Sequence, residues 1–243
     1  MLTISAGHFG KGTGAIGFLD EGSEVISVVN ALQVYFRTSA VKAQFILDTS
    51  SKNQAQNLRY LVTAHNNTQR ALDVIIDFNA SGDTREAGIG TEVLYVNPKM
   101  ADFAANVSAK VAAAGGFKDR GAKHRTNLAL LNGTVKPAII IEICFVNSKM
   151  DSANYTQNKA QIIEAIAVTL ESYFEKQATI SSPALTEKVQ AIYHDKARVQ
   201  VQLEKGVKDG AFQQVWLEKF ERGELTFIDY LAITALQFQK NIK

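Results

Sequence analysis

The feature that most constrains the fold is an apolar stretch near residue 140 that contains a single acidic residue. Residues 138–146 read AIIIEICFV, and the acid is Glu142. Pro137 precedes the stretch and Asn147 follows it, as is typical of a buried strand at the centre of a sheet. A bare buried carboxylate is costly, so Glu142 is expected to pair with an arginine, cap a loop, bind a metal or serve catalysis.

The composition indicates a globular protein rather than a nucleic-acid or membrane protein. The 243 residues are 46% hydrophobic and 21% charged, with a net charge of +2, which is too small to argue for a nucleic-acid partner. The one cysteine, Cys144, excludes a disulfide within the chain. We find no signal peptide pattern and no apolar run long enough to span a membrane, so we expect a chain that is cytoplasmic at synthesis.

Predicted strands and helices alternate through the first two thirds of the chain, which favours the α/β class: a mostly parallel, twisted sheet flanked by helices. The predicted strands are residues 2–6, 45–47, 74–76, 90–96 and 138–146. The predicted helices are residues 23–37, 53–68, 99–114 and 155–176. Between the third helix and the last strand, we interpret residues 119–125 as a basic loop and residues 128–131 as a short strand or turn.

The pattern changes at the sequence Ser-Ser-Pro of residues 181–183, after which only helices are predicted. We therefore divide the chain into a domain of residues 1–177 and a helical C-terminal region of residues 184–243. In that region Thr226 is expected to cap the last helix together with Asp229. About 60 residues bury little core alone, so this region is expected to pack on the first domain, on a partner or on a second copy.

Polar side chains follow several of the predicted strands. His8 lies in a glycine-rich loop after the first strand, and Glu24 lies in the first turn of a helix that we expect Ser23 to cap. Asp77 and Asn79 end the third strand, and Glu142 lies in the last one. Taken singly, His8 suits a solvent-facing loop and Glu24 a helix dipole. Together, one histidine and several carboxylates at one edge of a sheet indicate a hydrolytic zinc site.

These residues lie in segments that resemble the type 3 zinc-dependent N-acetylmuramoyl-L-alanine amidases, a group that includes many bacteriophage endolysins. The resemblance extends over about residues 1–175. It implies that His8 and Glu24 bind zinc and that Glu142 is the catalytic base; Cys144 occupies a position where the family usually has glycine. The matching segments, in the family's order, are SAGHFGKGTGA, SEVISVVNAL, DVIIDFNAS, GIGTEVLY, DRGAKHRTNLALLN and PAIIIEICFVNSKMD.

The third zinc ligand departs from the family pattern, in which a histidine precedes the sequence Asn-Ala by two residues. An alignment on Asn79-Ala80 puts Asp77 at that position, whereas an alignment on Asp73 puts Asn79 there. Both side chains lie on one face of a strand, so periodicity does not choose between them. Ligand chemistry favours Asp77, because a carboxylate binds zinc whereas an amide is a poor ligand.

The resemblance implies an enzyme that cleaves the amide between N-acetylmuramic acid and L-alanine in peptidoglycan, after its release to the bacterial cell wall. Asn79, Arg120 and Lys123 are then expected to contact the substrate, the last two through anionic wall groups. The C-terminal helices would target the wall, form a homo-oligomer or support the catalytic domain. The alternative is an amidase fold that has lost catalysis and serves as a peptidoglycan-binding or phage structural module, which zinc content would distinguish.

Overall fold

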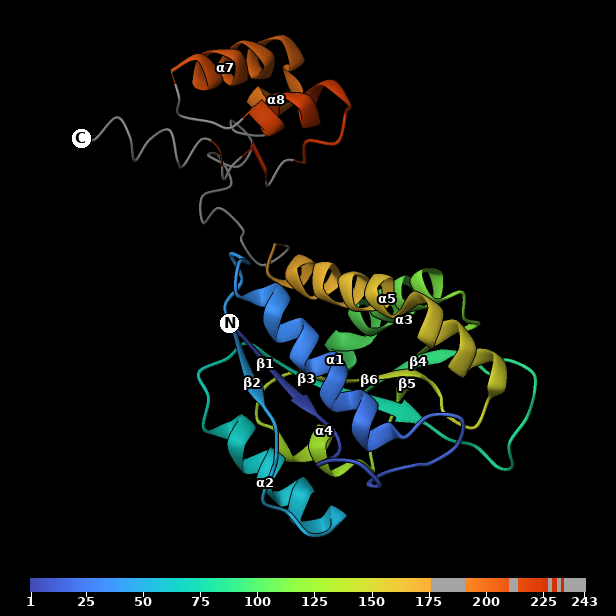
Figure 1. The fold of residues 1–243 in the computed structure, drawn as a ribbon. Coiled ribbons are helices and arrows are strands. Elements are labelled where there is room, and N and C mark those ends of the chain that lie inside the picture. Colours follow the sequence, from blue (N-terminus) through green and yellow to red (C-terminus); the bar gives the residue numbers. More distant parts are fainter. Residues whose placement is uncertain (176–190, 210–213, 227–228, 231–232, 234–243) are drawn as a thin grey trace. The chain divides into compact units, whose positions relative to one another are not determined.

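The computed structural model describes residues 1–175, 191–209, 214–226, 229, 230 and 233 (Figure 1). These residues fall into two compact units, Met1–Phe174 and Glu175–Lys243. Each unit has a hydrophobic cluster of its own. Among the described residues, no helix is both long enough and apolar enough to cross a membrane.

The first unit contains a six-stranded sheet with the strand order β2-β1-β3-β6-β4-β5. The strands β2, β1, β3 and β6 are parallel to one another, whereas β4 runs antiparallel to β6 and parallel to β5. The predicted mostly parallel sheet is therefore confirmed. The strands are β1 (Leu2–Ala6), β2 (Ala43–Ile46), β3 (Leu72–Asn79), β4 (Thr91–Tyr95), β5 (Asp119–His124) and β6 (Ala138–Phe145).

Helices cover both faces of this sheet (Figure 1). On one face α1, α3 and α5 pack on the larger hydrophobic cluster; on the other, α2 and α4 pack on a smaller cluster that includes Leu61 and Ile140. Because the central strands are buried on both faces, their sequences are almost continuously apolar. The helices are α1 (Glu21–Phe36), α2 (Gln54–Asn66), the 3₁₀ turn η1 (Pro98–Met100), α3 (Ala101–Gly115), α4 (Ala129–Gly133) and α5 (Lys149–Glu175).

Three local predictions differ from the structure. The basic segment expected to be a loop is strand β5, which pairs along β4. Residues expected to form a short strand or turn lie in helix α4. Helix α5 begins six residues earlier than predicted, at Lys149, because the backbone N–H of Ser152 already bonds to the carbonyl of Ser148. For β5 and α4, tertiary contacts decide the conformation that the local pattern left open.

A buried polar network fixes the joint between α2 and the sheet. His65 bonds through Nδ1 to Asp73 Oδ1 at 2.6 Å and through Nε2 to Ser5 Oγ at 2.9 Å. Arg70 donates to both oxygens of Asp73 at 2.8 Å. Since these side chains are almost completely buried and mutually satisfied, the network serves packing.

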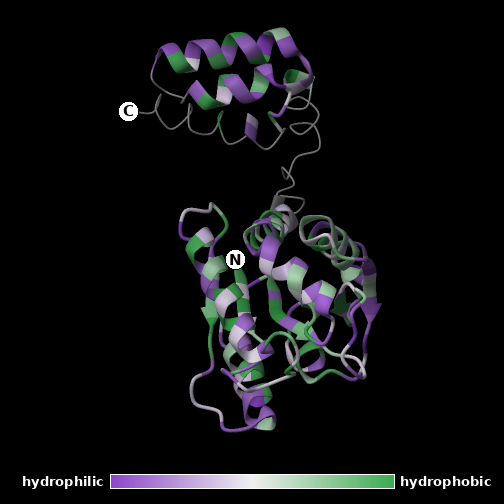
Figure 2. Ribbon diagram, turned by 45° about the vertical axis from the view of Figure 1, so that its right-hand side comes forward, coloured by the Kyte–Doolittle hydropathy of each residue, from purple (hydrophilic) through white to green (hydrophobic). Residues whose placement is uncertain are grey.

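The second unit is described through α7 (Lys196–Lys208) and α8 (Gln214–Glu221). Along α7 hydrophilic and hydrophobic residues alternate (Figure 2), and its buried residues Val199 and Leu203 cluster with Leu225 and Tyr230. Thr226 and Asp229 bond reciprocally to each other's backbone N–H, as the predicted cap requires. At the start of the predicted helical region, residues 184–190 lie outside the described residues. Asp195, which caps α7, separates residues 191–194 from that helix.

We predict that a chain truncated after Gln177 folds on its own. The two hydrophobic clusters of the first unit are complete within residues 1–174, so the truncation removes none of their members. Thermal unfolding followed by circular dichroism should show one cooperative transition within a few degrees of the transition of the same unit in the full chain. An insoluble product, or a melt without cooperativity, would show that the C-terminal region is part of the fold.

Candidate active site

His8 lies in the loop between β1 and α1. Strand β1 ends at Ala6, and the N–H of Gly7 bonds to the carbonyl of Ile76 on β3, so the loop leaves the sheet beside that strand. The loop is folded onto the start of α1, where the N–H of Gly12 bonds to Asp20 Oδ2 at 2.9 Å. This fold directs His8 toward the carboxyl end of β3.

Glu21 is the first residue of α1. The side chain of Asp20 caps this helix by accepting a hydrogen bond from the N–H of Ser23 at 2.8 Å, so the helix begins two residues before the predicted start. The carboxylate of Glu21 accepts hydrogen bonds from two backbone N–H groups, those of Ala15 at 2.6 Å and Phe78 at 3.0 Å. These bonds hold Glu21 over the end of β3.

His8, Glu21 and Asp77 form one cluster. The Nε2 atom of His8 lies 3.4 Å from Glu21 Oε2 and 3.4 Å from Asp77 Oδ1, and one ligand atom from each residue lies within 4.8 Å of the other two. All three side chains are largely buried. The structure thus brings two of the expected ligands, His8 and Asp77, together and adds Glu21.

The cluster fits a zinc ion by its donor chemistry and by its space. One imidazole nitrogen and two carboxylates are ligands of the kinds that zinc accepts, and three protein ligands leave a position for water or substrate. Gly14 lines the cluster, and a Cβ atom there would collide with both Glu21 Oε2 and His8 Nε2. A Cβ at Gly7 would lie 2.5 Å from Asp77 Oδ2. The chain therefore keeps room around the three donors.

Glu24, which was expected to bind zinc, and Asn79, the alternative to Asp77, lie outside the cluster. Glu24 bonds to Lys159 Nζ at 2.7 Å and to the hydroxyl of Tyr155 at 2.8 Å, so it joins α1 to α5. The expectation that Ser23 caps the helix is wrong, and the resulting shift of the helix start explains why Glu21 takes the position assigned to Glu24. Asn79 donates to Glu92 Oε1 at 3.1 Å and is not a member of the cluster.

The sequence contains a signal that Glu21 faces the sheet, namely its spacing from the apolar residues of the helix. Glu21 precedes Val25 by four residues and therefore lies on the same side of the helix, the side that faces the sheet. The identity of the capping residue decides where the helix begins: with Asp20 as the cap, Glu21 occupies the first turn.

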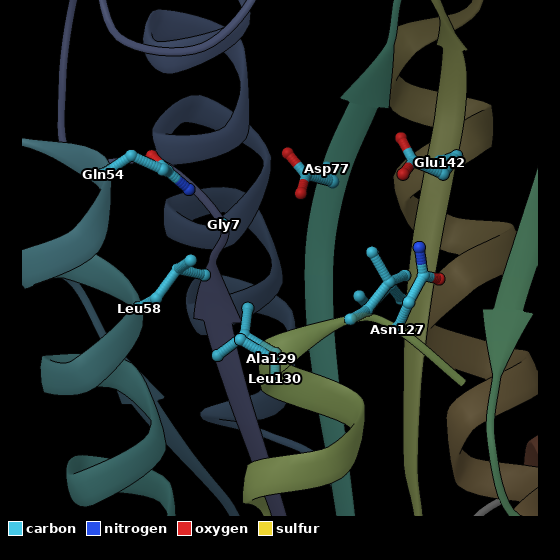
Figure 3. A pocket seen from close by; sticks show the side chains of 10 residues that line it. Gly7, Gln54, Leu58, Asp77, Asn127, Ala129, Leu130 and Glu142 are labelled. Carbon is cyan, nitrogen blue, oxygen red and sulfur yellow. The ribbon is translucent and has the colours of Figure 1, made fainter. Parts of the chain in front are cut away.

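Glu142 stands beside the cluster on the neighbouring strand. It pairs in register with Asp77 across β3 and β6, so both carboxylates project from the same face (Figure 3). They line a pocket of about 320 Å³ at the carboxyl ends of these strands. The Oε2 atom of Glu142 is buried and has no hydrogen-bond partner among the described residues. A buried, unpartnered carboxylate oxygen beside a pocket is available for a proton or a polar substrate.

The other walls of the pocket combine apolar side chains with two amides, and sequence analysis did not single them out. Gln54 and Leu58 approach from α2, whereas Asn127 lies just before α4 (Figure 3). No local pattern marks these residues, because they meet only through the packing of α2 and α4. The remaining lining residues are Gly7, Leu128, Ala129, Leu130 and Ile140.

Crowding of carboxylates sets the electrostatics of the site. Burial, together with the charge of Glu142, raises the pKa of Asp77 well above its usual range. Burial, followed by the charges of Glu21 and Glu92, likewise raises the pKa of Glu142. Burial also acts to raise the pKa of Glu21, but hydrogen bonds and the charge of His8 outweigh it, and the pKa is lowered. The site therefore attracts protons or a cation.

The two basic residues expected to bind substrate lie on strand β5, at the edge of the sheet. Arg120 bonds to Glu92 and stacks over the ring of Phe145, on the side of the sheet that carries Glu142. Lys123 is half-buried and pairs in register with Leu94 of β4.

Comparison with known proteins identifies the family. Residues 2–172 match the Amidase_3 family, described as N-acetylmuramoyl-L-alanine amidase, and the chain belongs to this family. Among curated proteins it is 29% identical over 167 residues to an uncharacterized 38.4 kDa protein of Clostridium perfringens. That match includes 67% of this chain and 48% of the relative, so the chain spans about half the length of this relative.

Solved structures of similar fold include amidases and an endolysin domain. The catalytic domain of the CD27L endolysin, which targets Clostridia difficile, is 26% identical with a TM-score of 0.63; the match covers 70% of this chain and 96% of that domain. An N-acetylmuramoyl-L-alanine amidase from Clostridium difficile 630 is 21% identical with a TM-score of 0.62, covering 72% of this chain and 96% of that one. The second likeness supports the fold alone.

We predict that Glu142→Gln stabilises the metal-free protein at neutral pH. A carboxyl group whose pKa is raised by folding contributes full stability below its unfolded pKa, and this stability is lost as the pH rises through the folded pKa. The amide carries no charge, so the variant avoids that loss. If the substitution restores about 1 kcal/mol of unfolding free energy, the melting temperature should rise by about 2–4 °C.

Calorimetry at pH 5 and pH 8, with a chelator present, measures this effect. The gain should be larger at pH 8 than at pH 5. A variant that is less stable than the parent at pH 8 would show that Glu142 is not under electrostatic strain.

Proposed function

We propose that the first unit is a zinc-dependent N-acetylmuramoyl-L-alanine amidase that hydrolyses the amide between N-acetylmuramic acid and L-alanine in peptidoglycan. The observation that carries the proposal is the cluster of His8, Glu21 and Asp77 beside the unpartnered carboxylate of Glu142. Membership of the amidase family supports the choice of bond and substrate.

The four side chains divide the chemistry between them. His8, Glu21 and Asp77 would hold the zinc ion, which when bound acts as a Lewis acid on the scissile carbonyl and makes water more acidic. Glu142 accepts a proton from the attacking water at Oε2 and donates it to the leaving amine of L-alanine. The raised pKa of Glu142 makes it a stronger base than a solvent-exposed glutamate.

The pocket orients the substrate. Its apolar walls, which include Leu58 and Ile140, suit the methyl groups on either side of the scissile amide, and the amides of Gln54 and Asn127 can bond to peptide groups. Glu142 and Asp77 lie at one end of this pocket, so a peptide seated there places its first amide beside both carboxylates (Figure 3).

The biological role that we propose is lysis of the bacterial cell wall by an endolysin-like enzyme. The likeness to the CD27L endolysin domain, at 26% identity over most of that domain, supports this role. A second candidate is a peptidoglycan-binding module without catalysis. It is favoured by one observation, the aspartate at position 77 in place of the family's histidine, and it requires that the protein bind no zinc.

We predict that Glu142→Gln lowers hydrolysis of purified cell walls by at least about 100-fold, the scale of a general base. Glutamine keeps the shape of the side chain but cannot accept the proton. Release of free amine groups from walls measures the rate, and zinc content checks that the metal site is intact. Undiminished hydrolysis by a zinc-loaded variant would rule out the role of Glu142.

We predict that Asp77→Ala and Glu21→Ala each abolish stoichiometric zinc binding, because each removes one of three ligands. Asp77→His should retain zinc or bind it more tightly. Zinc is measured by mass spectrometry after dialysis against the metal.

Two matched variants serve as controls for these ligands. Glu24→Ala alters a carboxylate one turn along the same helix, and Asn79→Ala alters a side chain two residues along the same strand; both should keep zinc bound. Retention of zinc in Asp77→Ala, with loss in Asn79→Ala, would show that the ligand assignment is wrong. A parent protein without zinc would favour the binding module instead.

A further inference from the structure

A row of charged residues crosses four neighbouring strands at the edge of the sheet that carries the active site. Asp77 of β3 pairs in register with Glu142 of β6, and Glu142 pairs in register with Glu92 of β4. Beyond Glu92, Arg120 of β5 completes the row with a bond of 2.7 Å from its Nε atom to Glu92 Oε2. Register partners project from the same face of a sheet, so Glu92 lies on the face that carries Asp77 and Glu142. The row therefore extends from the active site toward β5, the outer strand of the sheet.

The guanidinium group of Arg120 is held in one orientation. Besides the bond to Glu92, it lies 5.0 Å from the centre of the ring of Phe145, over the face of that ring. Glu92 is itself buried and fixed by Asn79, which donates to Oε1 at 3.1 Å. A long side chain fixed in this way loses little further entropy when it binds a ligand.

The arginine retains unused donors that face solvent. Its side chain is 34% exposed, in contrast to 4% for Glu92. Among the residues that the structure describes, neither terminal nitrogen of Arg120 makes a hydrogen bond. Such a fork suits two parallel bonds to a carboxylate.

The spacing of the strands indicates which part of a substrate would reach this fork. The guanidinium group of Arg120 is bonded to Glu92, which is the register partner of Glu142 on the next strand. Neighbouring strands lie about 4.8 Å apart, so one strand interval and one hydrogen bond separate Glu142 from the guanidinium group by roughly 5–8 Å. An extended peptide covers about 3.3–3.6 Å per residue. A group about two residue lengths from the scissile amide therefore reaches the arginine when the amide lies beside Glu142.

We propose that Arg120, positioned by Glu92 and Phe145, binds the carboxylate of the second residue of the peptidoglycan stem peptide. This inference rests on the proposed function, because the scissile amide fixes the origin of this spacing. In peptidoglycan that carboxyl group is either free or amidated, and the arginine selects the free form. The amide form offers one oxygen and no charge to the same donors, so it binds more weakly.

The test compares two synthetic substrates, muramoyl-L-alanyl-D-glutamate and its D-isoglutamine counterpart, with the zinc-loaded full chain. The parent protein should have the higher kcat/KM for the free acid. Arg120→Gln should reduce the ratio of the two kcat/KM values by about tenfold or more, the scale of a lost charge-assisted hydrogen bond. Arg120→Lys, which keeps the charge without the fork, should lie between them.

Matched variants separate recognition from folding. Lys110→Gln removes an exposed charge on α3, on the opposite face of the sheet, and should leave the ratio as in the parent. If Arg120→Gln is unstable because Glu92 is left unpaired, the double variant Glu92→Gln/Arg120→Gln removes both charges and should show the same loss of preference. An unchanged ratio in the folded variants, or a ratio that depends on Lys123 instead, would overturn the inference.

A binding measurement separates this inference from the proposed reaction. If the parent hydrolyses neither substrate, the proposed function fails, and calorimetric titration with the same two compounds still tests the arginine. Tighter binding of the acid than of the amide, lost in Arg120→Gln, supports the inference without catalysis. Equal affinities for the two compounds would contradict it.

Discussion

Mutual repulsion among carboxylates is the constraint around which this site is arranged. Asp77 and Glu142 are register partners on adjacent strands, and Glu21 meets Asp77 through His8. Two like charges about 5 Å apart cost roughly 3 kcal/mol at an effective dielectric constant of 20. The repulsion persists in the folded state because Asp77 and Glu142 lie on adjacent strands that fix the direction of both side chains. The same repulsion becomes affinity once a cation is bound, which is the basis of the proposed zinc site.

The scaffold divides into a part that holds the proposed metal ligands and a part that presents the proposed substrate contacts. The loop after β1, the start of α1 and the end of β3 provide His8, Glu21 and Asp77. The strands β4 and β5 run opposite to β6, so their first residues lie at the same edge as the last residues of β6. Because of this reversal, Glu92 and Arg120, near the starts of their strands, lie in line with Glu142, near the end of its strand.

The comparison of sequence with structure shows which features are local. The buried strands around Ile75 and Ile140 were predictable because their apolar runs allow no solvent-facing alternative. The helix start at Glu21 was missed because Asp20 and Ser23 are both good caps, and only the contacts of Asp20 with Gly12 and Ser23 decide between them. Strand β5 was missed because its polar sequence gains strand structure only from its partner β4. Strand direction and partner choice depend on contacts distant in sequence, and no local pattern contains them.

The central claim is that His8, Glu21 and Asp77 together hold a metal ion next to Glu142. Anomalous diffraction at the zinc absorption edge, from crystals grown with zinc, tests this claim most directly. The account predicts one strong anomalous peak at about 2.0–2.2 Å from His8 Nε2 and from carboxylate oxygens of Glu21 and Asp77. A peak bound by Glu24 or Asn79, or zinc-grown crystals with no peak at this site, would contradict it.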